Sequence, residues 1–517
     1  MNRNDYLISE KLKSPGLILQ ALKRLQSEVR KEGRKQFNEW KPTIHRKEFE
    51  FSAKNFAEYL ALRRRDLRHL QAALIPLGLS SLGRSEARVM PNLEAVIAAL
   101  SAMISKANAL TAPKQEDFLK GSLRLEANAD DILGKAPDRR NVRMMITLPS
   151  DAAKNYSLVS KLLEKGMNIA RINCAHDSEE EWSKMIAHIR RAEKSLGLTC
   201  KIFMDLGGPK VRTGEIVDKR TRDKGKQDVI AKGELIFLYG NKPRAKNNET
   251  LQVACAIPEI LPSIGVGHQV WIDDGHIGSV VEEKRDEGLI LRVTNVEAKG
   301  RKVKSDKGLN FPDSTLSISP LTSKDLNDLN FICKNADAIN YSFVQSAEDV
   351  LALQNEISTR LHQAKRNGKI LKKNNMLPIG MIAKIETKRA VENLPEIIIQ
   401  GAGNQPFGVM IARGDLAVEI GYQRIAEIQE ELLWLCEAAH VPVIWATQVL
   451  ESLVKKGIPS RAEITDAAMS ERAECVMLNK GDYILEAIEI LDNVLMRMGQ
   501  HQTKKMPQLR ELYSWRN

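Results

Sequence analysis

The chain has 517 residues, of which 43% are apolar and 28% are charged, and it carries a formal charge of +12 at pH 7. This length predicts about two to four domains, and the composition excludes a wholly disordered chain. No apolar stretch approaches the roughly 18 residues that a membrane span requires, and the N-terminus lacks the apolar core of a signal peptide, so we expect a cytoplasmic protein with no membrane partner. The positive charge favours anionic partners, either nucleic acid or phosphorylated small molecules.

The first part of the chain predicts a helical domain over residues 1–138. Segments such as GLILQALKRLQSEVRKEG (16–33) place apolar residues at helical spacing with Lys and Arg between them. A basic helical face can bind RNA, but the region has no RNA-binding signature and no interleaved aromatic surface. We therefore disfavour nucleic acid as a partner and assign this domain no role.

From about Asn141 the pattern changes to short apolar strands that alternate with amphipathic helices. Eight strands are predicted: VRMMIT (from 142), NIARI (168), CKIFMD (200), AINYSF (338), IGMIAKIE (379), FGVMIA (407), PVIWAT (442) and CVML (475). Eight such units predict an α/β fold of the (β/α)8 TIM barrel type.

One interruption divides this pattern between about Gly214 and Ser305, where the sequence is rich in Gly, Val and Ile with frequent turn signals. It predicts a small β-barrel domain inserted after the third strand. The expected organisation is an all-α extension at 1–138, a barrel at 139–214 and 306–500, an inserted β domain at 215–305, and a basic tail at 501–517.

Polar side chains recur at the carboxyl ends of the predicted strands, where barrels of this type carry their catalytic residues. They are Arg171, Asn173, Asp205, Lys384, Glu386, Asp415 and Thr447. Because side chains alternate along a strand, Lys384 and Glu386 share one face. Glu386 and Asp415 together suit a hard divalent cation, Mg²⁺ or Mn²⁺, better than zinc.

Other residues near these strand ends suit an anion. Arg171, Arg212 and Lys307 add positive charge where a phosphate could bind, and Gly414 lets the backbone of a helix N-terminus approach a ligand closely.

Each of these residues also has a purely structural interpretation. Lys384 and Glu386 could form an ion pair, Asp415 could cap a helix, and His176 could be an ordinary loop histidine. Burying several unpaired charges at the same end of one fold is costly, however. Their recurrence at strand ends therefore favours a functional site.

The motifs identify a resemblance to the pyruvate kinase family over about residues 141–497. The segments GMNIARINCAHDSEEEW, MDLGGPKVRTGEI, GMIAKIETKRAVENLPEI and VMIARGDLAVEIG follow one another in that family's order. The resemblance implies transfer of a phosphoryl group from phosphoenolpyruvate to ADP, giving pyruvate and ATP, with Mg²⁺ or Mn²⁺ as cofactor. It also implies a β domain that closes over the active site as a lid.

The resemblance further implies roles for single residues. Lys384 would stabilise the charge of the transferred phosphoryl group and of the enolate, with Arg171 and Thr447 as the other catalytic residues. Glu386 and Asp415 would bind the divalent metal. Asn173 and Asp205 would belong to a monovalent-cation region. The substrate and nucleotide contacts would be Arg171, Asn173, His176, Arg212, Lys307, Gly414, Asp415 and Thr447.

Several positions depart from the family pattern. A serine that normally helps to bind potassium is replaced by Ala175, the loop after the eighth strand reads LNKGDY in place of SGETA, and an expected arginine is Gln345. Lys210 stands where potassium-requiring members carry an acid, so we expect it to replace K⁺, which would then not be required. We also expect no counterpart of the family's C-terminal activator domain.

Two other functions remain open from the sequence. One is a Mg²⁺-dependent keto-acid lyase or aldolase, which would use the same barrel, metal and enolate. The other is a catalytically weak regulatory or binding protein, for which the missing SGETA loop argues. The sequence also leaves a homo-oligomer open.

Overall fold

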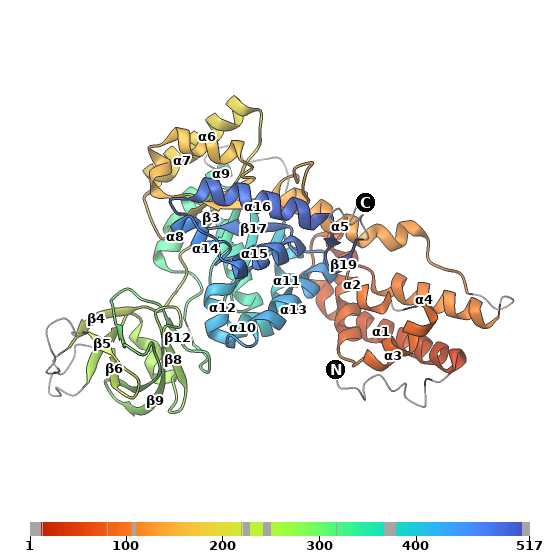
Figure 1. The fold of residues 1–517 in the computed structure, drawn as a ribbon, viewed down its shortest axis with the longest axis horizontal. Helices are drawn as coiled ribbons and strands as arrows, with labels where there is room; N and C mark the ends of the chain where they lie inside the picture. The colour runs from red at the N-terminus through yellow and green to blue at the C-terminus, as the bar shows by residue number, and fades with distance from the viewer. Residues whose placement is uncertain are drawn as a thin grey trace, which may run out of the picture.

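The computed structural model describes residues 12, 14–79, 81–105, 110–218, 220, 228–240, 250–316, 318–366 and 379–508. Its three parts are an N-terminal group of helices, a central barrel, and a β domain on the side of the barrel opposite the N-terminal helices (Figure 1). The predicted basic tail at 501–517 lies outside the described residues from 509 onward. Its first part forms a short hairpin of β18(Gln502–Thr503) and β19(Met506–Pro507).

The barrel is closed by eight parallel strands, which confirms the predicted fold class. Their spatial order is β1-β17-β16-β15-β14-β13-β3-β2. The strands are β1(Arg143–Thr147), β2(Ile169–Asn173), β3(Lys201–Asp205), β13(Ala338–Tyr341), β14(Gly380–Ile385), β15(Phe407–Ala412), β16(Val443–Ala446) and β17(Cys475–Leu478).

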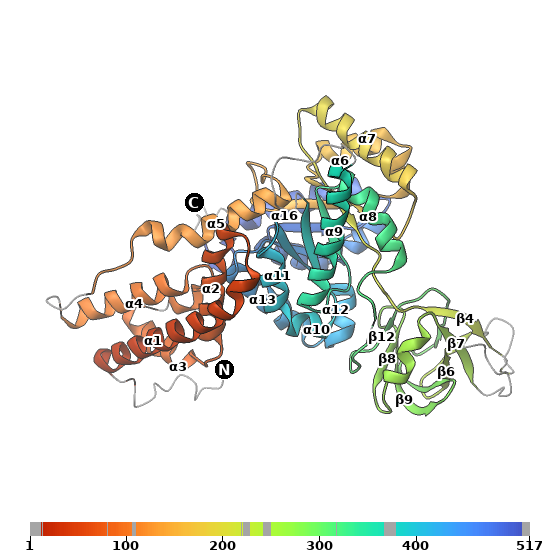
Figure 2. The ribbon, with the colours of Figure 1, turned by 180° about the vertical axis from the view of Figure 1, so that it is seen from behind.

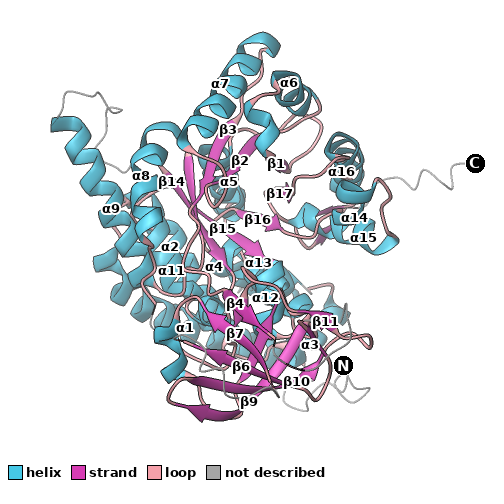
Figure 3. Cartoon of the chain, turned by 90° about the vertical axis from the view of Figure 1, so that its left-hand side faces the viewer, coloured by secondary structure: helices cyan, strands magenta, loops and turns pink. Residues whose placement is uncertain are grey.

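Helices follow the strands and surround the barrel, as Figures 2 and 3 show from two sides. They are α6(Tyr156–Glu164), α7(Glu179–Leu196), α8(Ser323–Asn335), α9(Ala347–Arg366), α10(Lys388–Glu392), α11(Leu394–Ala402), α12(Arg413–Ile420), α13(Ile425–Ala438), α14(Glu451–Lys456), α15(Arg461–Met469) and α16(Ile484–Gly499). Several begin at the caps that their sequences provide. In α8, Thr322 accepts a hydrogen bond from the Asp325 N–H while the Asp325 carboxylate accepts from the Thr322 N–H.

The barrel interior toward the amino-terminal ends of the strands is an apolar layer made by alternate residues of the strands. Its members include Met145, Ile169, Phe203, Ala338, Ile382, Met410, Ile444 and Cys475. The last turns of the N-terminal helix α5(Gln115–Leu133) belong to the same cluster through Ala129, Ile132 and Leu133. Helix α5 therefore closes the amino-terminal end of the barrel.

The remaining N-terminal helices are α1(Pro15–Trp40), α2(Lys47–Arg63), α3(Arg68–Leu74) and α4(Val89–Ile104). They share one continuous hydrophobic core with the outer face of the barrel. His440 joins the two parts, because its ring bonds Ser52 Oγ at 2.9 Å and the Ala87 carbonyl at 3.0 Å. Burial lowers the pKa of His440 to about 4, so the ring is neutral at pH 7.

The β domain is built on a seven-stranded sheet with the order β12-β8-β9-β10-β6-β7-β4. Its strands are β4(Thr213–Val217), β6(Leu235–Tyr239), β7(Leu251–Cys255), β8(Gln269–Ile272), β9(Ile277–Arg285), β10(Gly288–Asn295) and β12(Leu309–Asn310), beside a two-stranded pair of β5(Val229–Ile230) and β11(Arg301–Lys302). An isolated antiparallel bridge links Arg212 and Gly308, the residues that immediately precede the edge strands β4 and β12. The β domain has a hydrophobic core of its own.

None of the helices in the described ranges is both long enough and apolar enough to cross a lipid bilayer.

The contact of α5 with the barrel predicts a strong effect of adding one methyl group at Gly121. A Cβ there would lie 1.8 Å from the Ala87 carbonyl oxygen and 2.6 Å from His440 Nε2. We expect Gly121→Ala to destabilise the chain by about 1–3 kcal/mol through overpacking, measured as a lower midpoint of thermal unfolding. The adjacent exposed change Ser122→Ala is the control, and equal midpoints for both variants would contradict this packing.

Candidate active site

The barrel interior changes from apolar to polar toward the carboxyl ends of the strands. Residues two positions apart on a strand point to the same side, so each polar group follows an interior apolar residue of its own strand. The pairs are Ile169 and Arg171, Phe203 and Asp205, Ala338 and Asn340, and Ile382 and Lys384. All four polar side chains are buried.

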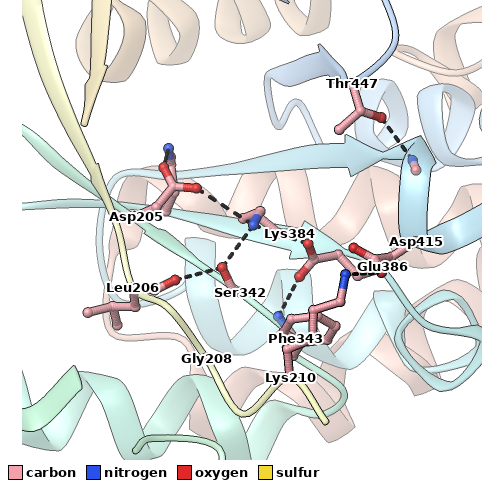
Figure 4. A network of polar contacts seen from close by, with 12 residues as sticks. Asp205, Leu206, Gly208, Lys210, Ser342, Phe343, Lys384, Glu386, Asp415 and Thr447 are labelled. Carbon is pink, nitrogen blue, oxygen red and sulfur yellow. Dashed lines mark hydrogen bonds and ion pairs between the residues drawn. The ribbon is translucent and has the colours of Figure 1, made fainter. Parts of the chain in front are cut away.

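Asp205 is the centre of this polar layer (Figure 4). Its carboxylate accepts two hydrogen bonds from Arg171, at 2.9 and 2.7 Å, and one from the Asn340 amide at 2.6 Å. Lys384 Nζ lies 3.6 Å from the same carboxylate. The remaining Arg171 nitrogen donates to Thr147 Oγ1 at 2.9 Å, so the guanidinium is fixed on two sides.

The electrostatics of Asp205 follow from these neighbours. Burial by itself would raise the pKa of Asp205, but the positive charges of Arg171 and Lys384 outweigh it and hold the pKa below its usual value. The carboxylate is therefore ionised at neutral pH.

Lys384 is oriented by three oxygen atoms. Its Nζ donates to Ser342 Oγ at 2.8 Å and lies 3.1 Å from Glu386 Oε1 as well as 3.6 Å from Asp205 Oδ2. The Ser342 hydroxyl in turn donates to the Leu206 carbonyl at 2.7 Å, which leaves its lone pairs for the ammonium. The positive charge is thus held at one position at the open end of the barrel.

Asn340 and Ser342 are two residues of this site that were not predicted from the sequence. Both were signalled by the same two-residue spacing of polar side chains after an apolar run that identified Lys384 and Glu386.

Glu386 is two residues after Lys384, so its side chain lies on the same face, beyond the carboxyl end of β14. Its Oε2 accepts a 2.6 Å hydrogen bond from the N–H of Phe343, a residue whose positive φ of 57° turns that N–H toward the carboxylate. Burial raises the pKa of Glu386, and the negative charge of nearby Asp415 adds to this effect while Lys384 opposes it. Asp415 lies in the first turn of α12, and Lys210 Nζ is 2.7 Å from its Oδ1.

These two carboxylates fit a hard divalent cation. Both offer oxygen ligands, and the mutual repulsion that raises the Glu386 pKa is what a bound cation would relieve. No group of three or more His, Cys, Asp or Glu side chains suited to a metal occurs in the part of the chain that the structure describes. A cation bound by Glu386 and Asp415 would keep most of its coordination positions for water and substrate oxygens.

Thr447 closes the site on the side of β16. Its Oγ1 accepts a 2.9 Å hydrogen bond from the Gly414 N–H, at the start of α12. Thr447, Gln448 and Leu450 all have positive φ angles, between 49° and 63°. Such backbone strain costs free energy and is typical of functional loops.

The other predicted site residues lie further from this network. Asn173 is the last residue of β2, and its Oδ1 accepts a 3.1 Å hydrogen bond from the Ala175 N–H in the following loop. His176 lies in the same loop and is exposed. Arg212 immediately precedes β4, and Lys307 lies between β11 and β12 of the β domain. Arg212 donates to the Asp306 carbonyl at 3.0 Å, and Lys307 Nζ is 3.0 Å from Asp273.

Comparison with known proteins places this barrel in one family. The family model described as "Pyruvate kinase, barrel domain" matches residues 139–488. A pyruvate kinase of Geobacillus stearothermophilus is 31% identical over 372 residues, which are 70% of this chain and 57% of that protein. A pyruvate kinase of Dictyostelium discoideum is 30% identical over 378 residues, which are 69% of this chain and 68% of that protein.

The fold comparison agrees with the sequence comparison. The crystal structure of a pyruvate kinase from Cryptosporidium parvum matches with a TM-score of 0.60 and 28% identity, covering 71% of this chain and 72% of that one. The chain therefore spans only 57% of the length of its Geobacillus relative but about two thirds or more of the other two.

The central position of Asp205 predicts that removing its charge destabilises the whole barrel. We expect Asp205→Asn to cost about 3–5 kcal/mol at neutral pH, because Arg171 and Lys384 would be left buried without their shared counter-charge. The pKa of Asp205 is lowered in the folded chain, so its contribution is present above about pH 4 and is lost as pH falls through the folded-state pKa.

Urea unfolding at pH 7 and at decreasing pH measures this effect. The difference in stability between Asp205→Asn and the unchanged chain should narrow in acid. Asp306→Asn is the matched control, because the Asp306 side chain is 85% exposed. A loss of stability no greater than that of the control would contradict the central role of Asp205.

Proposed function

The chain belongs to the pyruvate kinase family, and from this premise we propose that its barrel transfers a phosphoryl group from phosphoenolpyruvate to ADP, giving pyruvate and ATP. The observation that carries the proposal is the position of Lys384. Its ammonium is held between Ser342, Glu386 and Asp205 at the open end of the barrel. The family match runs through this entire barrel, so we do not favour a keto-acid lyase.

Phosphoryl transfer needs positioned positive charge more than covalent chemistry. Negative charge spreads over the transferred group and collects on the enolate oxygen left behind. A preorganised ammonium stabilises both without having to reorient during the reaction. In this proposal Lys384 supplies that charge, and Ser342 is a positioning residue that keeps its Nζ in place.

Glu386 and Asp415 are the proposed ligands of Mg²⁺ or Mn²⁺. When bound, that cation would neutralise negative charge on the oxygens of the substrate phosphate. Arg171 adds fixed positive charge beside the transferred group, and Arg212 and Lys307, next to β4 and β12, bring further positive charge from the β domain. Asn173, His176 and Gly414 complete the proposed substrate and nucleotide contacts.

Thr447 faces the start of α12 through its bond to the Gly414 N–H. We place its hydroxyl next to the substrate carboxylate, where it orients the enolate for protonation at carbon. Its strained backbone fixes the direction of that hydroxyl.

Pyruvate release from phosphoenolpyruvate, ADP and Mg²⁺ tests the proposed reaction. We expect Lys384→Met to lower kcat by about 100-fold or more with little change in the KM for phosphoenolpyruvate, because the lost contact acts mainly in the transition state. Lys456→Met, at an exposed position of α14, is the control. An unchanged kcat would remove Lys384 from the mechanism, and no pyruvate from the unchanged chain would contradict the reaction.

The proposal includes activity without K⁺. Lys210 brings a permanent positive charge into the site, 2.7 Å from Asp415, and Ala175 lacks the hydroxyl that would help to bind K⁺. A second cation nearby would be repelled by the ammonium. We expect equal rates in tetramethylammonium chloride and in KCl at constant ionic strength. A large stimulation specific to K⁺ would contradict this expectation, whereas a new K⁺ requirement in Lys210→Glu would support it.

A further inference from the structure

Lys210 lies in the connection between β3 and β4, yet its charge is directed to the barrel. Its Nζ is 2.7 Å from Oδ1 of Asp415 (Figure 4). The same Nζ is 3.5 Å from Oδ1 of Asp274 in the β domain. The side chains of Lys210 and Asp415 are only 17% and 19% exposed, whereas that of Asp274 is 68% exposed. The pair with Asp415 is therefore the stronger of the two, because water screens it less.

Lys210 is held between the β domain and the barrel. On the side of the β domain, a Cβ on Gly308, which immediately precedes β12, would lie 2.7 Å from Lys210 Cε. The connection that carries Lys210 packs on the loop after β13, since a Cβ on Gly208 would lie 2.9 Å from Ser342 Cβ and 3.1 Å from the Phe343 ring. The ammonium also lies 5.9 Å from the centre of the Phe343 ring.

A divalent ion and this ammonium compete for the same oxygen atom. Mg²⁺ binds carboxylate oxygens at about 2.0–2.1 Å, and the ammonium already donates a hydrogen bond to Asp415 Oδ1. Two cations on one oxygen of a half-buried carboxylate would repel each other strongly. The metal therefore gains Asp415 Oδ1 only when Lys210 moves away.

Asp274 is the nearest alternative partner for the displaced ammonium. It lies in a tight turn of the β domain, where Asp273 and Asp274 both have positive φ angles of 58° and 54°. The adjacent Gly275 faces α12, the helix that carries Asp415, because a Cβ there would lie 3.0 Å from Val418. The turn thus contacts the helix whose carboxylate Lys210 would release.

We propose that Lys210 is an internal cation that holds Asp415 in the metal-free chain and that a divalent ion displaces it onto Asp274. This inference rests on the proposed metal ligand Asp415. Its consequence is a coupling between metal binding and the position of the β domain, because the ammonium leaves a carboxylate of barrel helix α12 and moves to a carboxylate of the β domain.

Mn²⁺ titration of the full chain without substrate tests the inference, with free Mn²⁺ followed by electron paramagnetic resonance. We expect Lys210→Met to bind Mn²⁺ about tenfold more tightly than the unchanged chain, which lies within the usual range of coupling energies. Lys302→Met removes an equal charge from a pair within the β domain and should leave the affinity unchanged. Asp415→Asn should weaken binding and so locate the ion.

A double-mutant cycle tests the role of Asp274. Asp274→Asn should weaken Mn²⁺ binding about threefold in the unchanged chain and have no effect in the Lys210→Met background, because Asp274 acts only through Lys210. Equal weakening in both backgrounds would overturn this part of the inference, since it would show a direct attraction between Asp274 and the ion.

Equal or weaker Mn²⁺ binding by Lys210→Met would overturn the displacement itself. Lys210→Gln, which removes the charge but keeps a polar side chain, gives the same answer if Lys210→Met fails to fold. Pyruvate formation is measured separately. If Lys210→Met binds Mn²⁺ as the unchanged chain does, and the unchanged chain forms pyruvate, this inference alone is contradicted. If Lys210→Met binds Mn²⁺ more tightly but the unchanged chain forms no pyruvate, the proposed reaction alone is contradicted.

Discussion

A single buried carboxylate, that of Asp205, makes the polar end of this barrel stable. Arg171 and Lys384 come from strands on either side of it, and both buried cations share its negative charge. Because Asp205 contacts both, it holds the two cations at the carboxyl ends of their strands. Ser342 and Glu386 complete the surroundings of Lys384.

The two halves of the barrel interior differ in polarity along the barrel axis. Its amino-terminal half is filled by apolar side chains and closed by α5, whereas its carboxyl-terminal half holds the charges. The N-terminal helices share their core with the barrel, whereas the β domain has a separate core and is joined to the barrel by two connections. Separate cores are the usual condition for one part of a chain to move as a unit. Movement is therefore expected at the β domain and not at the N-terminal helices.

The carboxylates of the proposed site are paired with lysine side chains of the chain itself. Lys384 is paired with Glu386 and Asp205, and Lys210 with Asp415, so both proposed metal ligands already carry an ammonium partner. The two pairs differ in what holds them. Lys384 extends from a barrel strand, whereas Lys210 belongs to a connection that leads out of the barrel. Only the ammonium of Lys210 can leave its carboxylate when the β domain shifts. Movement of the β domain can therefore control metal binding through Lys210.

The sequence alone determined the barrel, the inserted β domain and the strand ends that carry chemistry, because periodicity and the alternation of side chains are local properties of a chain. It located Lys384, Glu386, Asp415 and Thr447 in this way. Only the tertiary structure decided which charges meet: that Asp205 pairs with Arg171, that Ser342 holds Lys384, that α5 closes the barrel, and that Lys210 lies on Asp415. These pairings join residues tens to hundreds of positions apart, and only the register of strands around a closed barrel and the path of two connections bring such residues together.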